Sequence, residues 1–208
     1  MPDDSLKPAL RAALRAHEIG DHTPYEISFA QKANSGGSFG FMQGDLAAGQ
    51  AIVHSTFRRC MAAAGMAEAV ITDLEHRLST KGAKPTIISA NEKQRIDAAL
   101  QGRRDLVDAM DESILQNVYR HLDTCVDVAA EVNRTIDPIA QLYIAMWVNM
   151  TGAPTKLLDW LRSPERGDTI SENDIQDYLR DQKYYREHPG NFPHIVNSAA
   201  KGAEKLPG

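Results

Sequence analysis

The sequence of 208 residues has only two cysteines, Cys60 and Cys125, and no excess of basic residues. Two cysteines exclude the disulfide-dense frameworks of small secreted domains, and we expect both to be buried free thiols, with a single disulfide as the alternative. The net charge of −5 argues against a nucleic-acid binder and against attachment to anionic lipid by charge alone.

Long apolar runs are also missing. No stretch approaches the roughly 18 apolar residues of a membrane span, and the first thirty residues show no secretory signal. Internal repeats and low-complexity segments are absent as well. With 42% hydrophobic residues, the chain is expected to form a single domain over residues 1–208, with an irregular tail from about residue 189.

What the sequence has in abundance is helical periodicity, with apolar residues three and four apart. Capping residues and glycines mark where several of these segments begin and end. The expected helices cover about 5–19, 46–64, 67–79, 89–102, 114–132, 155–163 and 171–185. The segment 137–150, DPIAQLYIAMWVNM, is apolar on nearly every face, which predicts a helix buried in the middle of the domain.

One early segment breaks the helical pattern. Residues 25–30, YEISFA, alternate in polarity and predict a short strand, and 38–43, SFGFMQ, would be its partner in a hairpin. The glycines of the turn between them allow two interpretations. They are purely structural, or they let the backbone approach a ligand and place Gln43 and Asp45 on one wall of a cleft. The turn lacks the motifs of phosphate-binding loops.

Glu18 lies in the last turn of the first predicted helix, shortly before Gly20. The partial negative charge of a helix C-terminus disfavours an ionised carboxylate there, and a partly apolar site would add to that effect. A carboxyl that keeps its proton at neutral pH is what general acid catalysis needs. A solvated surface glutamate is the alternative. We expect no metal site, because His17 and His22 would lie roughly 140° apart around a helix.

Two segments resemble the lysozyme-like superfamily, namely goose-type lysozymes, lytic transglycosylases and, more distantly, family 46 chitosanases. In these proteins a glutamate that ends a helix faces a small hairpin with a G-L-M-Q type motif, which here reads Gly40-Phe41-Met42-Gln43. Goose-type enzymes often continue to an acid two residues later, which is Asp45.

The second segment, LYIAMWVNMTGAPTKLLDWL, resembles the transglycosylase stretch in which a buried helix ends in A-Y-N-x-G and a helix ending in W-L follows. Asn149 stands at the asparagine. The sequence departs from the pattern in two ways: the spacing to Gly152 is longer by one residue, and Val148 replaces the tyrosine. Trp147 or Tyr143 would have to substitute for that tyrosine.

The resemblance implies a mainly α, lysozyme-like (α+β) fold, with a buried central helix and one small β-hairpin at the active-site cleft. It implies a muramidase-like glycoside hydrolase that cleaves β-1,4 bonds of peptidoglycan, with Glu18 as general acid and Asp45 as the base that activates water. Glu26 is the rival acid and Asp21 the rival base. A lytic transglycosylase, which leaves anhydro-muropeptides, and a non-catalytic binding domain are the alternatives. No cofactor is expected.

For the substrate, Gln43 and Ser38 are expected to bind the N-acetyl and hydroxyl groups of a sugar, and Phe39 or Tyr25 to cover its ring. The other substrate-binding candidates are Gly40 and Asn149. The polymer would be peptidoglycan or a related N-acetylhexosamine polymer, with chitin and chitosan left open. We expect action in the periplasm or cell wall, as a phage-type endolysin or as an injected effector, which would also imply an immunity protein as partner.

Overall fold

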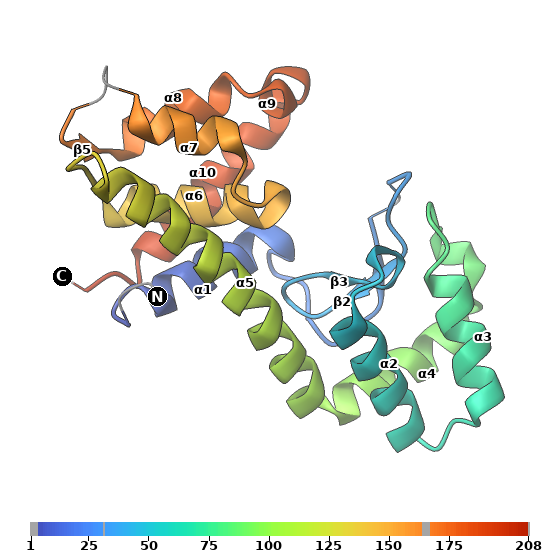
Figure 1. Ribbon diagram of the computed structural model, residues 1–208. Helices are drawn as coiled ribbons and strands as arrows, with labels where there is room; N and C mark the ends of the chain where they lie inside the picture. Colours follow the sequence, from blue (N-terminus) through green and yellow to red (C-terminus); the bar gives the residue numbers. More distant parts are fainter. Residues whose placement is uncertain (1–3, 31, 164–166, 208) are drawn as a thin grey trace. The chain divides into compact units, whose positions relative to one another are not determined.

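The computed structural model describes residues 4–30, 32–163 and 167–207. These residues form a mainly helical protein with a small antiparallel sheet, as the sequence predicts (Figure 1). A second sheet was not expected: β4 (Thr135–Ile136) and β5 (Thr169–Ile170) form a short parallel pair. No helix of the described residues is long and apolar enough to cross a membrane.

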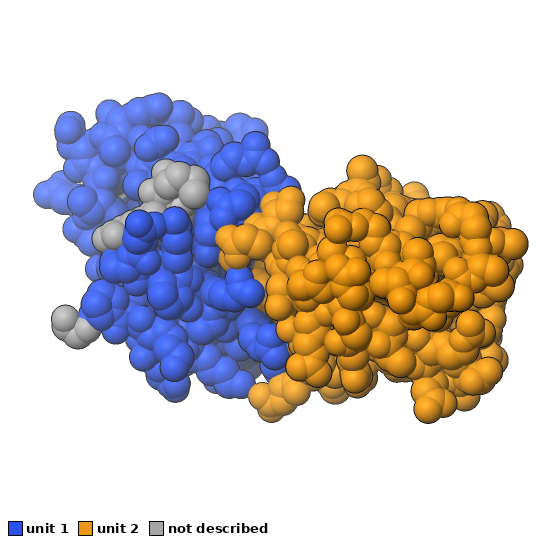
Figure 2. Space-filling view, turned by 90° about the horizontal axis from the view of Figure 1, so that it is seen from below, with its two compact units in different colours: residues 1–20, 116–208 blue, residues 21–115 orange. Residues whose placement is uncertain are grey.

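The chain, which the sequence predicts to be a single domain, divides into two compact units (Figure 2). Unit 1 comprises residues 1–20 and 116–208, and unit 2 comprises residues 21–115. One boundary falls inside helix α5 (Arg104–Ala130), which is continuous. Because the helical periodicity runs on through this boundary, the sequence offers no linker that would reveal it.

Unit 1 is built around three helices that pack on one another: α1 (Lys7–Glu18), α6 (Pro138–Thr151) and α10 (Phe192–Ala203). Helix α6 is buried along most of its length, as its all-round apolar sequence predicts. A Cβ on Gly202 of α10 would lie 2.8 Å from both the Ala13 side chain and the Ala9 carbonyl oxygen of α1. A glycine there therefore lets the two helices approach closely.

The C-terminal segment differs from the expectation. The tail expected to be irregular from about residue 189 forms a short 3-10 helix, Pro189–Asn191, and then α10. Its buried face is made largely of small residues, which give a weak hydrophobic period. The predicted helix 171–185 is also two helices, α8 (Glu172–Arg180) and α9 (Lys183–Glu187). Helix α7 (Thr155–Arg162) is as predicted.

Unit 2 contains a three-stranded sheet in the order β1 (Ser28–Phe29), β2 (Gly37–Phe39) and β3 (Gly44–Asp45). The expected hairpin is the β1–β2 pair, but its second strand, predicted over 38–43, ends at Phe39. Residues 40–43 form a tight turn, and β3 is an addition that follows it. Ser38 of the middle strand pairs with Ser28 on one side and with Asp45 on the other.

The helices of unit 2 are α2 (Ala51–Ala63), α3 (Glu68–Leu78), α4 (Ala90–Gly102) and the first part of α5. Helix α2 begins later than residue 46, because Leu46–Ala48 form a separate 3-10 turn that ends at Gly49 with φ of 71°. Apolar side chains of the sheet and of these helices form one core, which includes Phe39 and Phe57.

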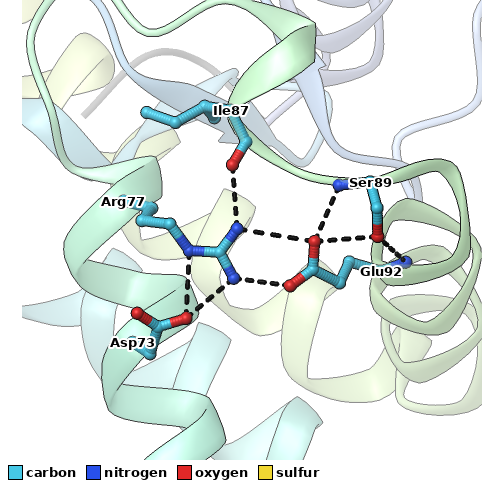
Figure 3. A network of polar contacts seen from close by, with 5 residues as sticks. All are labelled: Asp73, Arg77, Ile87, Ser89 and Glu92. Carbon is cyan, nitrogen blue, oxygen red and sulfur yellow. Dashed lines mark hydrogen bonds and ion pairs between the residues drawn. The ribbon is translucent and has the colours of Figure 1, made fainter.

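Arg77 links α3 to α4 through hydrogen bonds and ion pairs (Figure 3). Its guanidinium donates to the Ile87 carbonyl at 2.8 Å and to Glu92 at 2.6 Å, and it pairs with Asp73. Glu92 also closes the predicted capping box with Ser89. The hydrogen bonds from Arg77 and Ser89 lower the pKa of Glu92 to about 2.

Both cysteines are free and buried, as expected. Burial raises the pKa of Cys60 to about 11 and that of Cys125 to about 12. Neither thiol therefore carries the thiolate character that a reactive cysteine needs at neutral pH.

Candidate functional site

The candidate acid Glu18 is the last residue of α1, as the sequence predicts. The helix stops there because the Ile19 N–H closes the last turn on the Arg15 carbonyl and Gly20 follows with φ of 56°. The Glu18 side chain is half-buried. A carboxyl at this position is held by the helix yet is still open on one side.

Asn149, in the last turn of α6, donates a hydrogen bond from Nδ2 to Oε1 of Glu18 at 2.8 Å. The two residues are 131 positions apart in sequence, and both come from the motifs that carry the resemblance. The bond occupies one carboxyl oxygen with a donor.

The turn that carries Glu18 is supported from α10 as well. The His194 Nε2 atom lies 2.8 Å from the His17 carbonyl oxygen, and the two imidazole rings stack with centroids 5.0 Å apart. A carbonyl oxygen only accepts, so Nε2 of His194 carries the hydrogen. This bond satisfies one of the carbonyl groups that a helix end leaves without an intrahelical partner.

A cavity of about 470 Å³ adjoins the same helix end within unit 1. Its lining includes Gly20, His194, Asn197 and Lys201. Amide, imidazole and ammonium groups thus border a space large enough for part of a small ligand.

Neither Tyr143 nor Trp147 replaces the missing tyrosine beside Asn149. The Tyr143 hydroxyl is fully engaged with α8, donating to Glu172 and accepting from Gln176, each at 2.9 Å. Tyr143 lies six residues before Asn149, which is about 240° around the helix. Trp147 is buried, as expected, and its ring packs 5.8 Å from that of Tyr185.

The carboxylate of Asp45 in unit 2 accepts three local hydrogen bonds. Ser35 Oγ donates to Oδ2 at 2.7 Å, while the Gly36 and Ala47 N–H groups donate to Oδ1 at 2.9 and 2.8 Å. Asp45 thereby caps the 3-10 turn and ties the β1–β2 loop to β3. These bonds give Asp45 a structural role in addition to any chemical one.

Gln43 has a strained backbone, with φ of 50° for a non-glycine residue. Its side-chain Nε2 donates to the Gly40 carbonyl at 3.0 Å, and Oε1 accepts from Ser28 Oγ at 2.8 Å. The amide has two hydrogens and two lone pairs, so these bonds use half of its capacity. The half-buried Gln43 retains the means to bind an N-acetyl or hydroxyl group.

Two expected sugar contacts are corrected by burial. Phe39 is fully buried and packs on Phe57 with ring centroids 6.3 Å apart, and Ser38 is only 3% exposed. The middle strand β2 is buried at all three positions, because both faces of this short sheet are covered. Neither side chain is therefore placed to contact a sugar, and we assign Phe39 and Ser38 to the core.

Gly40 lacks space for a side chain because a buried acid of α5, Asp111, lies against it. The sequence patterns did not predict a role for this acid. A Cβ on Gly40 would lie 2.3 Å from Oδ1 of Asp111 in α5. Asp111 is fully buried and accepts from the N–H groups of Phe41 and Met42 at 2.8 and 3.0 Å. The sequence does contain a sign of this role: Asp111 lies midway between Val107 and Leu115, on what is otherwise an apolar face of the helix.

Tyr25 is held by the same helix. Its hydroxyl donates to Asp108 at 2.9 Å, and the Arg104 guanidinium lies over its ring, 5.0 Å from the centroid. The half-buried Tyr25 is thus fixed within unit 2 by its hydroxyl and by one ring face. The rivals Glu26 and Asp21 are both exposed.

Among the residues that the structure describes, no three His, Cys, Asp or Glu side chains group so as to hold a metal ion. The chain matches no protein-family model, and comparison with curated proteins and with solved structures gave no match.

Proposed function

We propose that the protein cleaves β-1,4 glycosidic bonds in the glycan strands of peptidoglycan, with Glu18 as the general acid. The observation that carries the proposal is the hydrogen bond from Asn149 to Glu18, within unit 1. It joins the acid and the asparagine of two separate motifs that resemble those of lysozyme-like enzymes. A surface glutamate without a function would not need an amide from a distant helix to orient it.

Glycoside cleavage requires a proton on the leaving oxygen as the bond breaks. Glu18 would supply that proton, while the Asn149 amide holds Oε1 and so orients the carboxyl. General acid catalysis of this kind contributes roughly 10²- to 10⁴-fold to the rate. The Gln43 amide would bind the sugar, and Tyr25 would supply an aromatic contact to it.

In the hydrolytic route, Asp45 acts as the base that activates water, and the products are reducing sugars of inverted configuration. The carboxylate is fixed by its three donors, and Oδ2 accepts only one of these bonds. A water molecule could therefore still be bound by Oδ2.

The second candidate is a lytic transglycosylase, in which the 6-hydroxyl of the sugar attacks and an anhydro ring forms. One observation favours it. The three hydrogen bonds already explain why an acid stands at Asp45, so no catalytic base is required to account for it. Either route would have the protein act in the periplasm or cell wall, as an effector or an endolysin.

Mass spectrometry of digested peptidoglycan tests the proposal. We expect wild-type protein to release muropeptides, and Glu18→Gln to release none, with Glu26→Gln as the matched control on an exposed carboxylate. Reducing ends that disappear in Asp45→Asn indicate the hydrolase, and anhydro ends that persist in it indicate the transglycosylase. Binding to peptidoglycan without any product would leave a non-catalytic domain and refute the proposal.

A further inference from the structure

The turn from Gly40 to Gln43 is held in an unfavourable backbone conformation. It begins with φ of 82° at Gly40 and ends with φ of 50° at Gln43. Left-handed backbone at a residue other than glycine, asparagine or aspartate is rare and persists only where surrounding contacts enforce it. Something in unit 2 must therefore stabilise this turn.

Asp111 is that contact. Its two carboxylate oxygens accept from two successive N–H groups, Phe41 on Oδ2 at 2.8 Å and Met42 on Oδ1 at 3.0 Å. The carboxylate is 0% exposed, so both amides and the acid are removed from water together. The arrangement fits only a glycine at position 40, because the first side-chain atom of any other residue would overlap Oδ1.

Burying a carboxylate to accept hydrogen bonds from two amides carries a large free-energy cost. Desolvation of the charge costs several kcal/mol, and apolar replacements of buried charges are often more stable. What a carboxylate adds is a bidentate acceptor that fixes two consecutive peptide planes at once. The residue that follows those planes is Gln43, whose side chain retains one N–H and one lone pair beyond its bonds to Gly40 and Ser28.

We infer that Asp111 is a positioning residue: it holds the strained turn so that the amide of Gln43 is presented to an N-acetylated sugar. This inference rests on the proposed function, since Gln43 is assigned there to substrate binding. Asp111 itself touches no substrate. Its effect on binding should therefore depend on the presence of Gln43.

The variant Asp111→Asn isolates this role. An asparagine can accept only one of the two N–H groups, and its NH₂ would face the other in either orientation. We expect binding of the β-1,4-linked N-acetylglucosamine trimer to weaken on the order of tenfold, by the loss of a charge-assisted hydrogen bond that holds the turn. The binding constant is measured by calorimetry, which needs no catalysis.

Asp97→Asn is the matched control. Asp97 is another carboxylate of unit 2 that accepts from a backbone N–H, that of Ile27 at 2.8 Å, and it lies outside the turn. Hydrogen exchange should show loss of protection at Phe41 and Met42 in Asp111→Asn and not in Asp97→Asn. If Asp111→Asn fails to fold, Asp111→Glu keeps the charge but displaces the carboxylate, and the same measurements apply.

A double-mutant cycle separates positioning from general stability. In a Gln43→Ala background, Asp111→Asn should weaken trimer binding no further, because the presented amide is already gone. An equal loss in both backgrounds, unchanged binding in Asp111→Asn, or no trimer binding by wild-type protein would each overturn the inference. Trimer binding that depends on Asp111 in a protein that never cleaves peptidoglycan would instead overturn the proposed function alone.

Discussion

The two units hold their candidate carboxylates in opposite ways. In unit 1, Glu18 ends a helix, is half-buried and accepts from the side-chain amide of Asn149. In unit 2, Asp45 accepts from the N–H groups of Gly36 and Ala47, and Asp111 accepts from two N–H groups within the turn 40–43. The acid of unit 1 is oriented by one side chain, whereas the acids of unit 2 shape the backbone.

The two arrangements suit different roles: one allows proton transfer, and the other holds the backbone in place. A carboxylate oriented by an amide can still lose and regain a proton at its second oxygen. A buried carboxylate that binds two N–H groups would leave both unpaired if it were removed, so it stabilises the fold. Mutations of Glu18 and its partner Asn149 should therefore act mainly on rate, and mutations of Asp111 mainly on stability and binding. Mutations of Asp45 should act on stability and, in the hydrolytic route, on rate as well.

The largest effect is expected at Gly40. Gly40→Ala should lower the free energy of unfolding by about 3 kcal/mol, because the new Cβ meets Asp111 in addition to the strain of a positive φ. Gly49→Ala is the control, since Gly49 has a similar φ of 71° and no atom within 4 Å of the added Cβ. It should lose only about 1 kcal/mol. Urea unfolding measures both, and equal losses would show that the contact with Asp111 is unimportant.

The next effect concerns the three hydrogen bonds of Asp45. Asp45→Ala should destabilise unit 2 by about 2 kcal/mol, since two backbone N–H groups lose their acceptor. Asp45→Asn should cost less than about 1 kcal/mol, because its Oδ1 keeps both N–H groups and its NH₂ can donate to Ser35 Oγ. Thermal unfolding of the pair checks this. A large loss in Asp45→Asn would mean that the charge itself is needed for the fold.

In unit 1 the expected effect is on rate. Asn149→Ala should reduce kcat about tenfold with little change in KM or in stability, because one hydrogen bond that orients the Glu18 carboxyl is removed. Turnover is followed as release of soluble muropeptides, and thermal unfolding provides the control for folding. Full activity in Asn149→Ala would remove this residue from the mechanism and weaken the assignment of Glu18.

The smallest expected effect is a difference between the two units in how their stability depends on pH. The lowered pKa of Glu92 means that its contribution to unit 2 is present above its unfolded value and is lost as pH falls from about 4.5 toward about 2. In unit 1, burial raises the pKa of Tyr178 to about 12 and also raises that of Tyr143. Their contribution is present below about 10 and is lost as pH rises from there.

Acid should therefore weaken unit 2 first. Alkali should weaken unit 1 more, because it holds Tyr143, Tyr178 and Cys125 with raised pKa values, whereas Cys60 gives unit 2 a smaller alkaline response. Both tryptophans, Trp147 and Trp160, belong to unit 1, so their emission reports that unit, whereas hydrogen exchange reports both. Glu92→Gln should remove part of the acid response of unit 2 and leave the alkaline response unchanged. Simultaneous loss of both units at either extreme would show that they unfold as one.

The sequence by itself determined the local features of this protein. Apolar spacing predicted most helices and the burial of α6, and the Ser89–Glu92 capping box predicted where α4 begins. The glutamate at the end of α1 was also predicted, because helix ends are marked by nearby residues such as Gly20. All of these depend on interactions within a few turns of the chain.

Tertiary structure alone decided what those features contact. The division inside α5, the helical C-terminal segment against α1, and the burial of Phe39 depend on packing that periodicity does not encode. The bond between Asn149 and Glu18 spans 131 residues, and that between Asp111 and Phe41 spans 70. A hydrogen bond forms where the folded chain brings donor and acceptor within about 3 Å, and sequence spacing carries no information about that distance when the partners lie on different elements.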